Sequence, residues 1–154
     1  MYSHRDAERC ALNQPTRTAP TAQEEIRDLA GAYALACDRR DAARFTALFD
    51  PGAQLVVHMP GAEATVRQAP DGISSIPAFL ARFDQTFHFT GLHRIVVDGD
   101  AATGDVYCDA HHRTGRQDLV MHIHYEDRYR RGADGWRFAR RDVRVLWTDT
   151  REIG

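Results

Sequence analysis

The sequence predicts an α+β fold, a cone-shaped α+β barrel in which three N-terminal helices pack on a strongly curved, mostly antiparallel sheet and enclose a pocket. Helical apolar spacing is confined to the first 87 residues, and extended runs separated by turn motifs fill the rest. Helices followed by a meander are typical of a helical layer on one sheet face. The length of 154 residues fits one domain. We expect a flexible N-terminal arm over 1–20, the domain over 21–148 and a C-terminal tail over 149–154.

Three helices are expected in the first half of the chain. The first covers 23–40, where apolar residues recur at spacings of three and four. Asp41 is a suitable cap for a short second helix that ends at Phe49, before an Asp-Pro-Gly turn. Apolar spacing also predicts a third helix over 76–87, with Pro77 in its first turn. The apolar positions of the first helix are Ile26, Leu29, Ala30, Tyr33 and Cys37.

Strand signals lie between the second and third helices and again after His88. Residues 53–58 form the first predicted strand, and 60–72 form a loop with room for a short second strand. Four extended runs follow, and Gly-containing turn motifs separate them, so we expect an antiparallel meander. The runs cover residues 92–98, 101–113, 119–131 and 135–147.

Composition excludes several classes of function. The net charge is −2 and acidic and basic groups are mixed along the chain, so neither a nucleic-acid nor a membrane partner is expected. All 20 basic residues are arginine, which excludes Schiff-base chemistry through a lysine. Cys10, Cys37 and Cys108 form no Cys-x-x-Cys pair, and no long apolar run is present. These features predict a cytoplasmic protein without a disulfide framework.

The residues with the clearest chemical potential are the histidines and one carboxylate. Six of the eight histidines fall between residues 88 and 124. Asp38 lies in the last turn of the first helix, where the unpaired carbonyls disfavour a further negative charge, so it requires a donor or a cation. A histidine would meet that need and could then move protons near neutral pH. Pairing of Asp38 with a surface arginine (Arg39, Arg40 or Arg44) is the alternative.

The order of these motifs carries a resemblance to a known family. A helix EEIRDLAGAYALACDRRD is followed by a phenylalanine that ends a short helix and by a histidine after the third helix. HRIVVDGDAATGDVYCDAHH and YEDRYRRGADGWRFARRDVRVLW then complete the pattern. Over about residues 21–148 this order resembles the SnoaL-like branch of the nuclear-transport-factor-2-like superfamily. That branch includes scytalone dehydratase, bile-acid 7α-dehydratase and lindane dehydrochlorinase.

The resemblance implies a site in which a histidine removes a proton and an aspartate holds that histidine, in a deep and mostly apolar pocket. The aspartate falls on Asp38, and a tyrosine of the bile-acid enzyme falls on Tyr33. Counting back from the DGD turn places the histidine on His88, with His93 as the rival. An asparagine position of the family holds Leu92 here, which removes one polar contact with a substrate.

The resemblance also implies accessory groups on the later strands. Because adjacent strand residues face opposite sides, one of His111 and His112 is expected to face the pocket, and we favour His111. Arg141 matches a position for an arginine that steadies a departing anion, with Arg140 as its competitor and a solvated basic strand as the structural alternative. The expected substrate-binding residues are Leu92, Phe83, Tyr125 and Trp136.

His122, His124 and Glu126 offer a second type of site, because they share one strand face and could supply three metal ligands. The opposite face of this strand is more apolar and carries Met121, Ile123 and Tyr125. If that apolar face lines the pocket, the histidine row faces solvent or a subunit partner. We therefore expect no metal at the main site.

Together these observations predict a cofactor-independent lyase of the dehydratase type, or an isomerase or cyclase, acting on a small and largely apolar ring substrate. A non-catalytic ligand-binding or assembly module is the alternative, and a metal-dependent enzyme using the His-x-His row is the third. No cofactor is expected. The family also implies a homodimer or homotrimer that pairs through the outer sheet face, for which Val143, Val145 and Trp147 would be suitable contacts.

Overall fold

The computed structural model describes residues 19–154, which form three helices and six strands. The expected N-terminal arm lies almost entirely outside the described residues. The helices are α2 (Ala22–Asp38), α3 (Ala42–Ala47) and α4 (Asp71–Leu80). The strands are β1 (Phe49–His58), β2 (Thr65–Gln68), β3 (Gln85–Asp98), β4 (Ala101–Thr114), β5 (Gln117–Gly132) and β6 (Gly135–Glu152).

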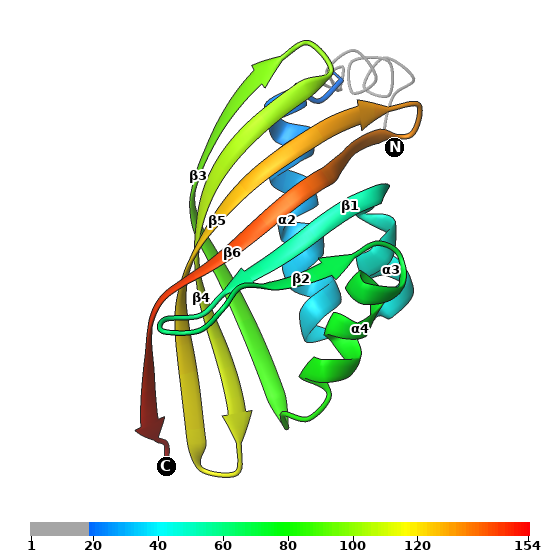
Figure 1. Cartoon of the computed structure of the whole chain (residues 1–154). Coiled ribbons are helices and arrows are strands. Elements are labelled where there is room, and N and C mark those ends of the chain that lie inside the picture. The colour runs from blue at the N-terminus through cyan, green and yellow to red at the C-terminus, as the bar shows by residue number, and fades with distance from the viewer. Residues whose placement is uncertain (1–18) are drawn as a thin grey trace, which may run out of the picture.

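All six strands belong to one curved sheet, whose order is β2-β1-β6-β5-β4-β3. Neighbouring strands are antiparallel except β1 and β6, which are parallel. The sheet is not closed, because β2 and β3 remain as its two edges. The helices lie on its concave side, with α2 across the sheet and α4 facing its lower half (Figure 1). The predicted α+β fold of helices on a curved, mostly antiparallel sheet is confirmed.

Local sequence explains both ends of α2. Thr21 caps the first turn and exchanges hydrogen bonds with Glu24 in a capping box. The helix ends at Asp38, and Arg40 follows with a φ of 58°, in the left-handed region that usually terminates a helix. The side chain of Arg40 then folds back and donates to the carbonyls of Cys37 and Asp38. This turn fixes the position of the Asp38 carboxylate.

Aromatic rings hold the helices on the sheet. Tyr33 of α2 packs against Phe45 and Phe49, with ring centroids 5.0 and 6.3 Å apart, and against Tyr125 and Phe138 of the sheet at 5.8 and 5.9 Å. Each of these rings is at most 5% exposed, so the cluster excludes water from one end of the concave side. Burial of these large rings supplies much of the hydrophobic stabilisation of the domain.

The third helix lies earlier in the chain than predicted. It spans Asp71–Leu80 with Pro77 inside it, and residues 85–87 already belong to β3. The apolar spacing through Phe87 was misleading because β3 carries its large apolar residues on the outer face. Phe87 and Phe89 are 53% and 61% exposed, whereas Thr86 between the helices and sheet is buried. Pairing with β4, rather than local propensity, decides the conformation of this segment.

Strand β6 differs from expectation in two ways. It continues to Glu152, so most of the expected C-terminal tail is paired with β5. A bulge at Leu146 also changes which face its side chains occupy, because Val145 pairs with Ile123 while Trp147 pairs with the adjacent His122. Val143 and Val145 therefore lie on the concave side, and the expectation that they form an outer contact with Trp147 is wrong. Of these three residues, only Trp147 is exposed on the outer face.

Two further observations concern membrane-spanning helices and free cysteines. None of the helices in the described part of the chain combines the length and the apolar character that crossing a bilayer requires. Cys37 and Cys108 are buried free thiols, and Cys10 lies outside the described residues.

Candidate functional site

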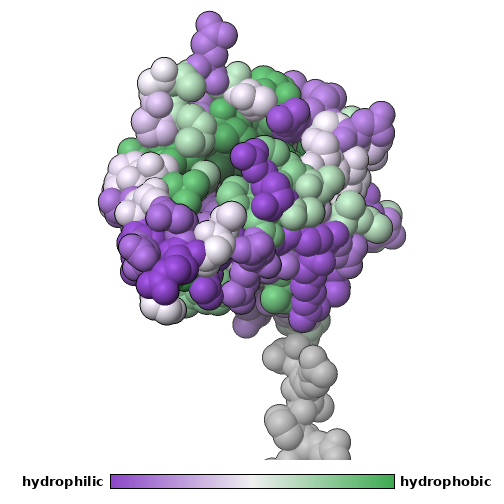
Figure 2. All heavy atoms as spheres, turned by 90° about the horizontal axis from the view of Figure 1, so that it is seen from below, coloured by the Kyte–Doolittle hydropathy of each residue, from purple (hydrophilic) through white to green (hydrophobic). Residues whose placement is uncertain are grey.

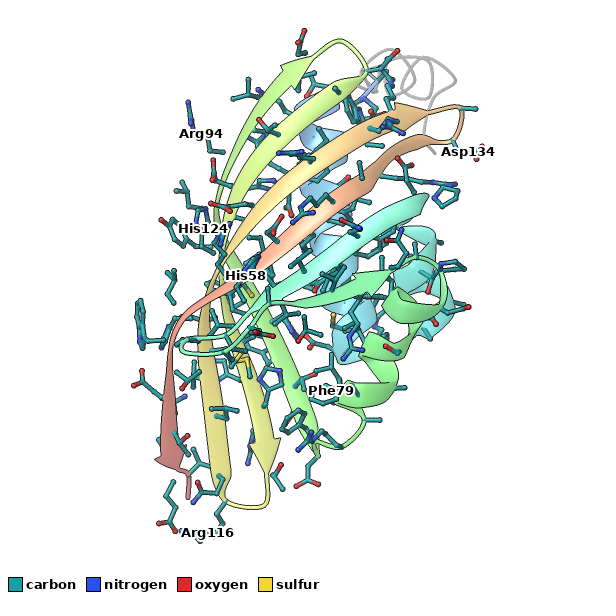
Figure 3. All side chains as sticks on the ribbon, in the orientation of Figure 1. His58, Phe79, Arg94, Arg116, His124 and Asp134 are labelled. Carbon is teal, nitrogen blue, oxygen red and sulfur yellow. The ribbon has the colours of Figure 1, made fainter. Side chains whose placement is uncertain are left out.

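An apolar pocket of about 350 Å³ lies between the helices and the concave face of the sheet. Ile76, Phe79 and Leu80 of α4 form one wall, and the apolar face of β5 forms another. Phe79 lies on the sheet side of α4 in Figure 3, and hydrophobic residues gather in a hollow of the lower face in Figure 2. The pocket volume of about 350 Å³ is in the range of small-molecule binding sites.

A second depression, of about 500 Å³, lies on the outer face of the sheet. Its walls include charged side chains that already pair with one another, such as Arg140 with Asp142 and Arg144 with Glu126. Because these groups satisfy each other, the apolar pocket is the better candidate for a ligand site.

His88 and Asp38 form a dyad at the wall of the apolar pocket. The Nδ1 atom of His88 lies 2.7 Å from Oδ1 of Asp38, and the His88 main-chain N–H donates to Oδ2 at 3.1 Å. These two contacts fix both the ring and the carboxylate. Among the predicted candidates, the histidine that meets Asp38 is therefore His88.

Two further residues hold the Asp38 carboxylate. The hydroxyl of Thr86 donates to Oδ1 of Asp38 at 2.9 Å and itself accepts from the guanidinium of Arg40. Burial raises the pKa of Asp38, but the hydrogen bonds from His88 and Thr86 outweigh burial and place this pKa below its usual value. Asp38 is thus an ionised acceptor, which keeps a proton on Nδ1 of His88.

His112 is the second histidine of the pocket. It is 5% exposed, lines the cavity and packs edge to face against His88. Burial and the neighbouring His88 lower the pKa of His112 to about 4, and its buried Nδ1 has no partner among the described residues. His112 is therefore neutral at pH 7.

The remaining histidines of the predicted site lie elsewhere. His111 faces the outer side of the sheet, where its Nδ1 is 2.9 Å from Asp118, so the expectation that His111 rather than His112 faces the pocket is wrong. Strand alternation required one inward residue but could not say which. His93 contacts the hydroxyl of Tyr129 at 3.3 Å and does not line the pocket.

Tyr33, a predicted catalytic residue, and Tyr125, a predicted substrate-binding residue, both line the pocket. Burial raises the pKa of each phenol well above the usual value, so both remain protonated donors. Cys37 lines the pocket as well, and burial raises the pKa of its thiol. A thiolate nucleophile is not available there at neutral pH.

Arg141 lies behind the pocket rather than in it. Its guanidinium makes two hydrogen bonds to Asp127, at 2.8 and 2.7 Å, and both side chains are essentially fully buried. The Cζ atom of Arg141 stands 4.2 and 4.0 Å from the ring centres of Tyr33 and Tyr125. These rings separate Arg141 from the cavity, so a direct contact with a departing anion does not fit this arrangement.

The other predicted site residues do not line the pocket. Arg140 pairs with Asp142 on the outer face, and Leu92 is 63% exposed beside a register shift of β3. Phe83 packs on the ring of His112, with centroids 4.8 Å apart, and so supports the pocket from behind. Trp136 is buried in the core away from the cavity.

The His-x-His row faces away from the pocket. His122 pairs with Asp109 and Asp149, and His124 pairs with Asp105, all on the outer face. Figure 3 shows His124 on the side of the sheet opposite the helices. Met121, Ile123 and Tyr125, on the opposite face of this strand, line the pocket. Across residues 19–154, no group of three or more His, Cys, Asp or Glu side chains is arranged to hold a metal.

Sequence reasoning missed three polar residues of the pocket, namely Thr65, Arg67 and Ser75. Thr65 and Arg67 belong to the short strand β2, and Ser75 belongs to α4. The possible short strand within residues 60–72 is the sequence signal that could have located Thr65 and Arg67. Its inward face could not be assigned because the pairing of this strand with β1 depends on distant sequence.

Comparison with known proteins agrees with the fold. The model of the SnoaL-like domain matches residues 19–142. No curated protein matches the sequence. A hexachlorocyclohexane dehydrochlorinase, LinA-type3 from Novosphingobium barchaimii, superposes with a TM-score of 0.73 at 18% identity, covering 95% of this chain and 94% of its own.

Two solved structures from Novosphingobium aromaticivorans are also similar. A candidate scytalone dehydratase has a TM-score of 0.73 at 20% identity and covers 84% of this chain and 87% of its own. An NTF2-like protein with a cystatin-like fold has a TM-score of 0.70 at 23% identity and covers 91% and 87%. At these identities the likeness establishes the fold alone.

Proposed function

This chain belongs to the SnoaL-like domain family, and from that membership and its pocket we propose that it is a cofactor-independent lyase of the dehydratase type, or an isomerase or cyclase. The substrate is a small, largely apolar ring compound. The observation that carries the proposal is the dyad, in which Asp38 holds Nδ1 of His88 at 2.7 Å on the wall of an apolar pocket. The names of two structural relatives, a candidate scytalone dehydratase and a dehydrochlorinase, support elimination chemistry.

In the proposed reaction, His88 acts as the base and Asp38 as its positioning partner. Asp38 keeps the proton on Nδ1, so the lone pair of Nε2 removes a proton from a substrate carbon. The carbon–hydrogen electrons form the new double bond as the bond to the leaving oxygen breaks. The proton held by His88 then passes to that oxygen, which leaves as water, and Asp38 stabilises the imidazolium in between.

Tyr33, Tyr125 and His112 are proposed to bind the oxygen functions of the substrate. Both phenols are protonated donors and His112 is neutral, so all three can hydrogen-bond developing negative charge without adding a carboxylate to the site. His112 takes the accessory place that the sequence assigned to His111. Arg141 contributes indirectly, through its contacts with the tyrosine rings.

The test is turnover by His88→Ala and Asp38→Asn across a panel of hydroxylated ring ketones, followed by absorbance of the conjugated product. We expect losses of about 10² to 10⁴-fold in kcat for His88→Ala, with the far-UV circular dichroism unchanged. His111→Ala is the matched control, because it removes another His–Asp pair outside the pocket. Equal turnover by His88→Ala and the wild type would exclude the proposal.

A non-catalytic ligand-binding module is the second candidate, favoured by the apolar lining itself. In that case His88→Ala and Asp38→Asn would change ligand affinity only modestly, and no substrate of the panel would be turned over. A metal-dependent enzyme finds less support, because His122, His124 and Glu126 are engaged in ion pairs. We also propose that the chain forms a homodimer or homotrimer.

A further inference from the structure

Arg67 gives the pocket a charge that the dyad does not require. Among the described residues that line the cavity, none is an aspartate or a glutamate, and Arg67 is the one side chain there that is charged at every physiological pH. Asp38 stands behind His88 and does not line the cavity. A positive group therefore faces an apolar space with no carboxylate beside it.

The register of β2 directs Arg67 to the pocket. Arg67 pairs with Leu55 and Thr65 pairs with Val57, and all four residues line the cavity. Within residues 19–154, Arg67 makes no ion pair and no side-chain hydrogen bond, whereas Arg140 on the outer face is bound to Asp142. A guanidinium in that state has all its donors available for a ligand.

Helix α4 holds the backbone of Arg67 in place. A Cβ atom at Gly72 would lie 3.3 Å from both the carbonyl carbon and the Cα of Arg67, so the helix packs directly on this part of β2. The bare glycine permits that approach. Arg67 is thus presented from a fixed backbone at the rim, although its side chain is exposed.

Arg67 and His88 reach the pocket from the two edge strands of the sheet. Arg67 belongs to β2 and His88 to β3, and these strands are the two edges of the sheet. The cavity between them is lined by apolar side chains of α4 and of the central strands. A ligand that fills the cavity would thus meet both a cation and the dyad.

We propose that the ligand of this pocket is an apolar ring compound with a carboxylate, and that Arg67 binds the carboxylate while the ring lies against the aromatic and aliphatic lining. Guanidinium groups bind carboxylates through two parallel hydrogen bonds, which fixes orientation as well as position. Bound in this way, the far side of the ring faces His88. The identification of this compound as a substrate rests on the proposed function; its binding does not.

Calorimetric titration with 2-naphthoate and with its neutral isostere 2-naphthamide tests the inference. At pH 7 and low salt, we expect the wild type to bind the carboxylate about tenfold more tightly than the amide, since an exposed charged hydrogen bond contributes on the order of 1.5 kcal/mol. Arg67→Gln should remove this preference and leave the amide affinity unchanged. Arg94→Gln, which makes the same charge change on the outer face, should keep it (Figure 3).

Each outcome separates the two proposals. Equal affinities for the two probes in the wild type, or a preference that survives Arg67→Gln, would overturn the role of Arg67 and leave the dyad untouched. If neither probe binds, the pocket does not accept aromatic carboxylates and the inference fails. If the carboxylate preference follows Arg67 while His88→Ala retains full turnover, the ligand assignment stands and the proposed catalysis fails.

Discussion

The rings of His88 and His112 meet edge to face on the pocket wall, with their centroids 5.8 Å apart. Burial disfavours protonation of His112, and the neighbouring His88 adds to the penalty because two imidazoles this close disfavour double protonation. Of these two histidines, only His88 has a carboxylate partner, because its Nδ1 atom lies 2.7 Å from Oδ1 of Asp38. The pair therefore divides into one proton carrier and one neutral hydrogen-bonding group.

The low pKa of His112 predicts a loss of stability on mild acidification. Its pKa is about 4 in the folded protein and 6.5 in an unfolded chain, so the unfolded state binds more protons between these values. The free energy of unfolding should thus fall as the pH drops from 6.5 towards 4. Between pH 7 and pH 5, His112 alone should account for a loss of about 2 kcal/mol.

Urea unfolding of the wild type and of His112→Phe at pH 7 and pH 5 measures this contribution. The variant keeps an aromatic ring against Phe83 but cannot titrate, so its loss over this interval should be smaller by about 2 kcal/mol. Burial also lowers the pKa of His93, which stays in both proteins and cancels in the comparison. If the free energy of unfolding fell by the same amount in both proteins between pH 7 and pH 5, the neutral state of His112 would be contradicted.

The hydroxyl of Thr86 is predicted to help keep Asp38 ionised. Thr86→Val removes one donor to Oδ1 and one of the three acceptors of the Arg40 guanidinium, so the pKa of Asp38 should rise. Titration of the Asp38 carboxyl carbon by NMR would detect the change. Thr86→Ser keeps the hydroxyl and should restore the wild-type titration; an unchanged Asp38 pKa in Thr86→Val would show that the hydroxyl is a bystander.

The sheet and its hairpins could be predicted from sequence because their signals are local. The turn at Asp98-Gly99-Asp100 uses a glycine with a φ of 58°, and Gly115 has a φ of 57° in the next hairpin, as such turns require. The helix ending at Asp38 likewise follows from local spacing. These features depend on a few neighbouring residues, so no tertiary information was needed.

The predictions that were wrong concern features that depend on pairing between strands far apart in the sequence. In β3 the polar Thr86 and His88 face inward, whereas Phe87 and Phe89 face outward. This reverses the usual strand pattern, in which apolar side chains face the core, and it brings the polar groups of the site to the inner face. The bulge at Leu146 likewise appears only when β6 is set against β5. The family resemblance therefore pointed to Asp38 and His88, whereas strand alternation did not identify His112 as the inward member of the 111/112 pair.

The exposed aromatic residues of the outer face predict self-association. Phe87, Phe89, Tyr107 and Trp147 are each 46–61% exposed there, and such groups favour burial at interfaces. We expect sedimentation of a homodimer or homotrimer and dissociation to monomers in Phe89→Glu or Trp147→Glu. Exposed Phe79 on α4 provides the control, since Phe79→Glu should not alter assembly. A monomeric wild type at micromolar concentration would contradict the prediction.

Two glycines should respond to alanine in opposite directions. A Cβ at Gly104 would lie 2.9 Å from Cε2 of Tyr129, a buried ring whose hydroxyl is held by Asp127, so Gly104→Ala should destabilise by about 1–3 kcal/mol. Gly31 lies inside α2 with open space around its Cβ position, and Gly31→Ala should stabilise by roughly 0.5–1 kcal/mol. Urea unfolding measures the change in the free energy of unfolding for both variants. Equal changes would show that the Tyr129 ring can move aside for the added methyl group.

Removal of one partner of the buried Arg141–Asp127 pair should be far more damaging than removal of both. Arg141→Met leaves Asp127 buried without its cation, which costs about 3–5 kcal/mol, whereas the double variant with Asp127→Leu leaves no unpaired charge. The single variant should therefore unfold at lower urea than the double variant. A single variant as stable as the wild type would contradict this description of the pair.

The same double variant separates a structural role of Arg141 from a chemical one. Because the rings of Tyr33 and Tyr125 stand between its guanidinium and the cavity, loss of the charge should leave the 2-naphthoate affinity within about twofold of the wild type. Arg67→Gln, which acts at the rim, is the positive control for a loss of carboxylate binding. If the double variant instead lost the carboxylate preference while remaining folded, Arg141 would be acting on the ligand through the aromatic layer.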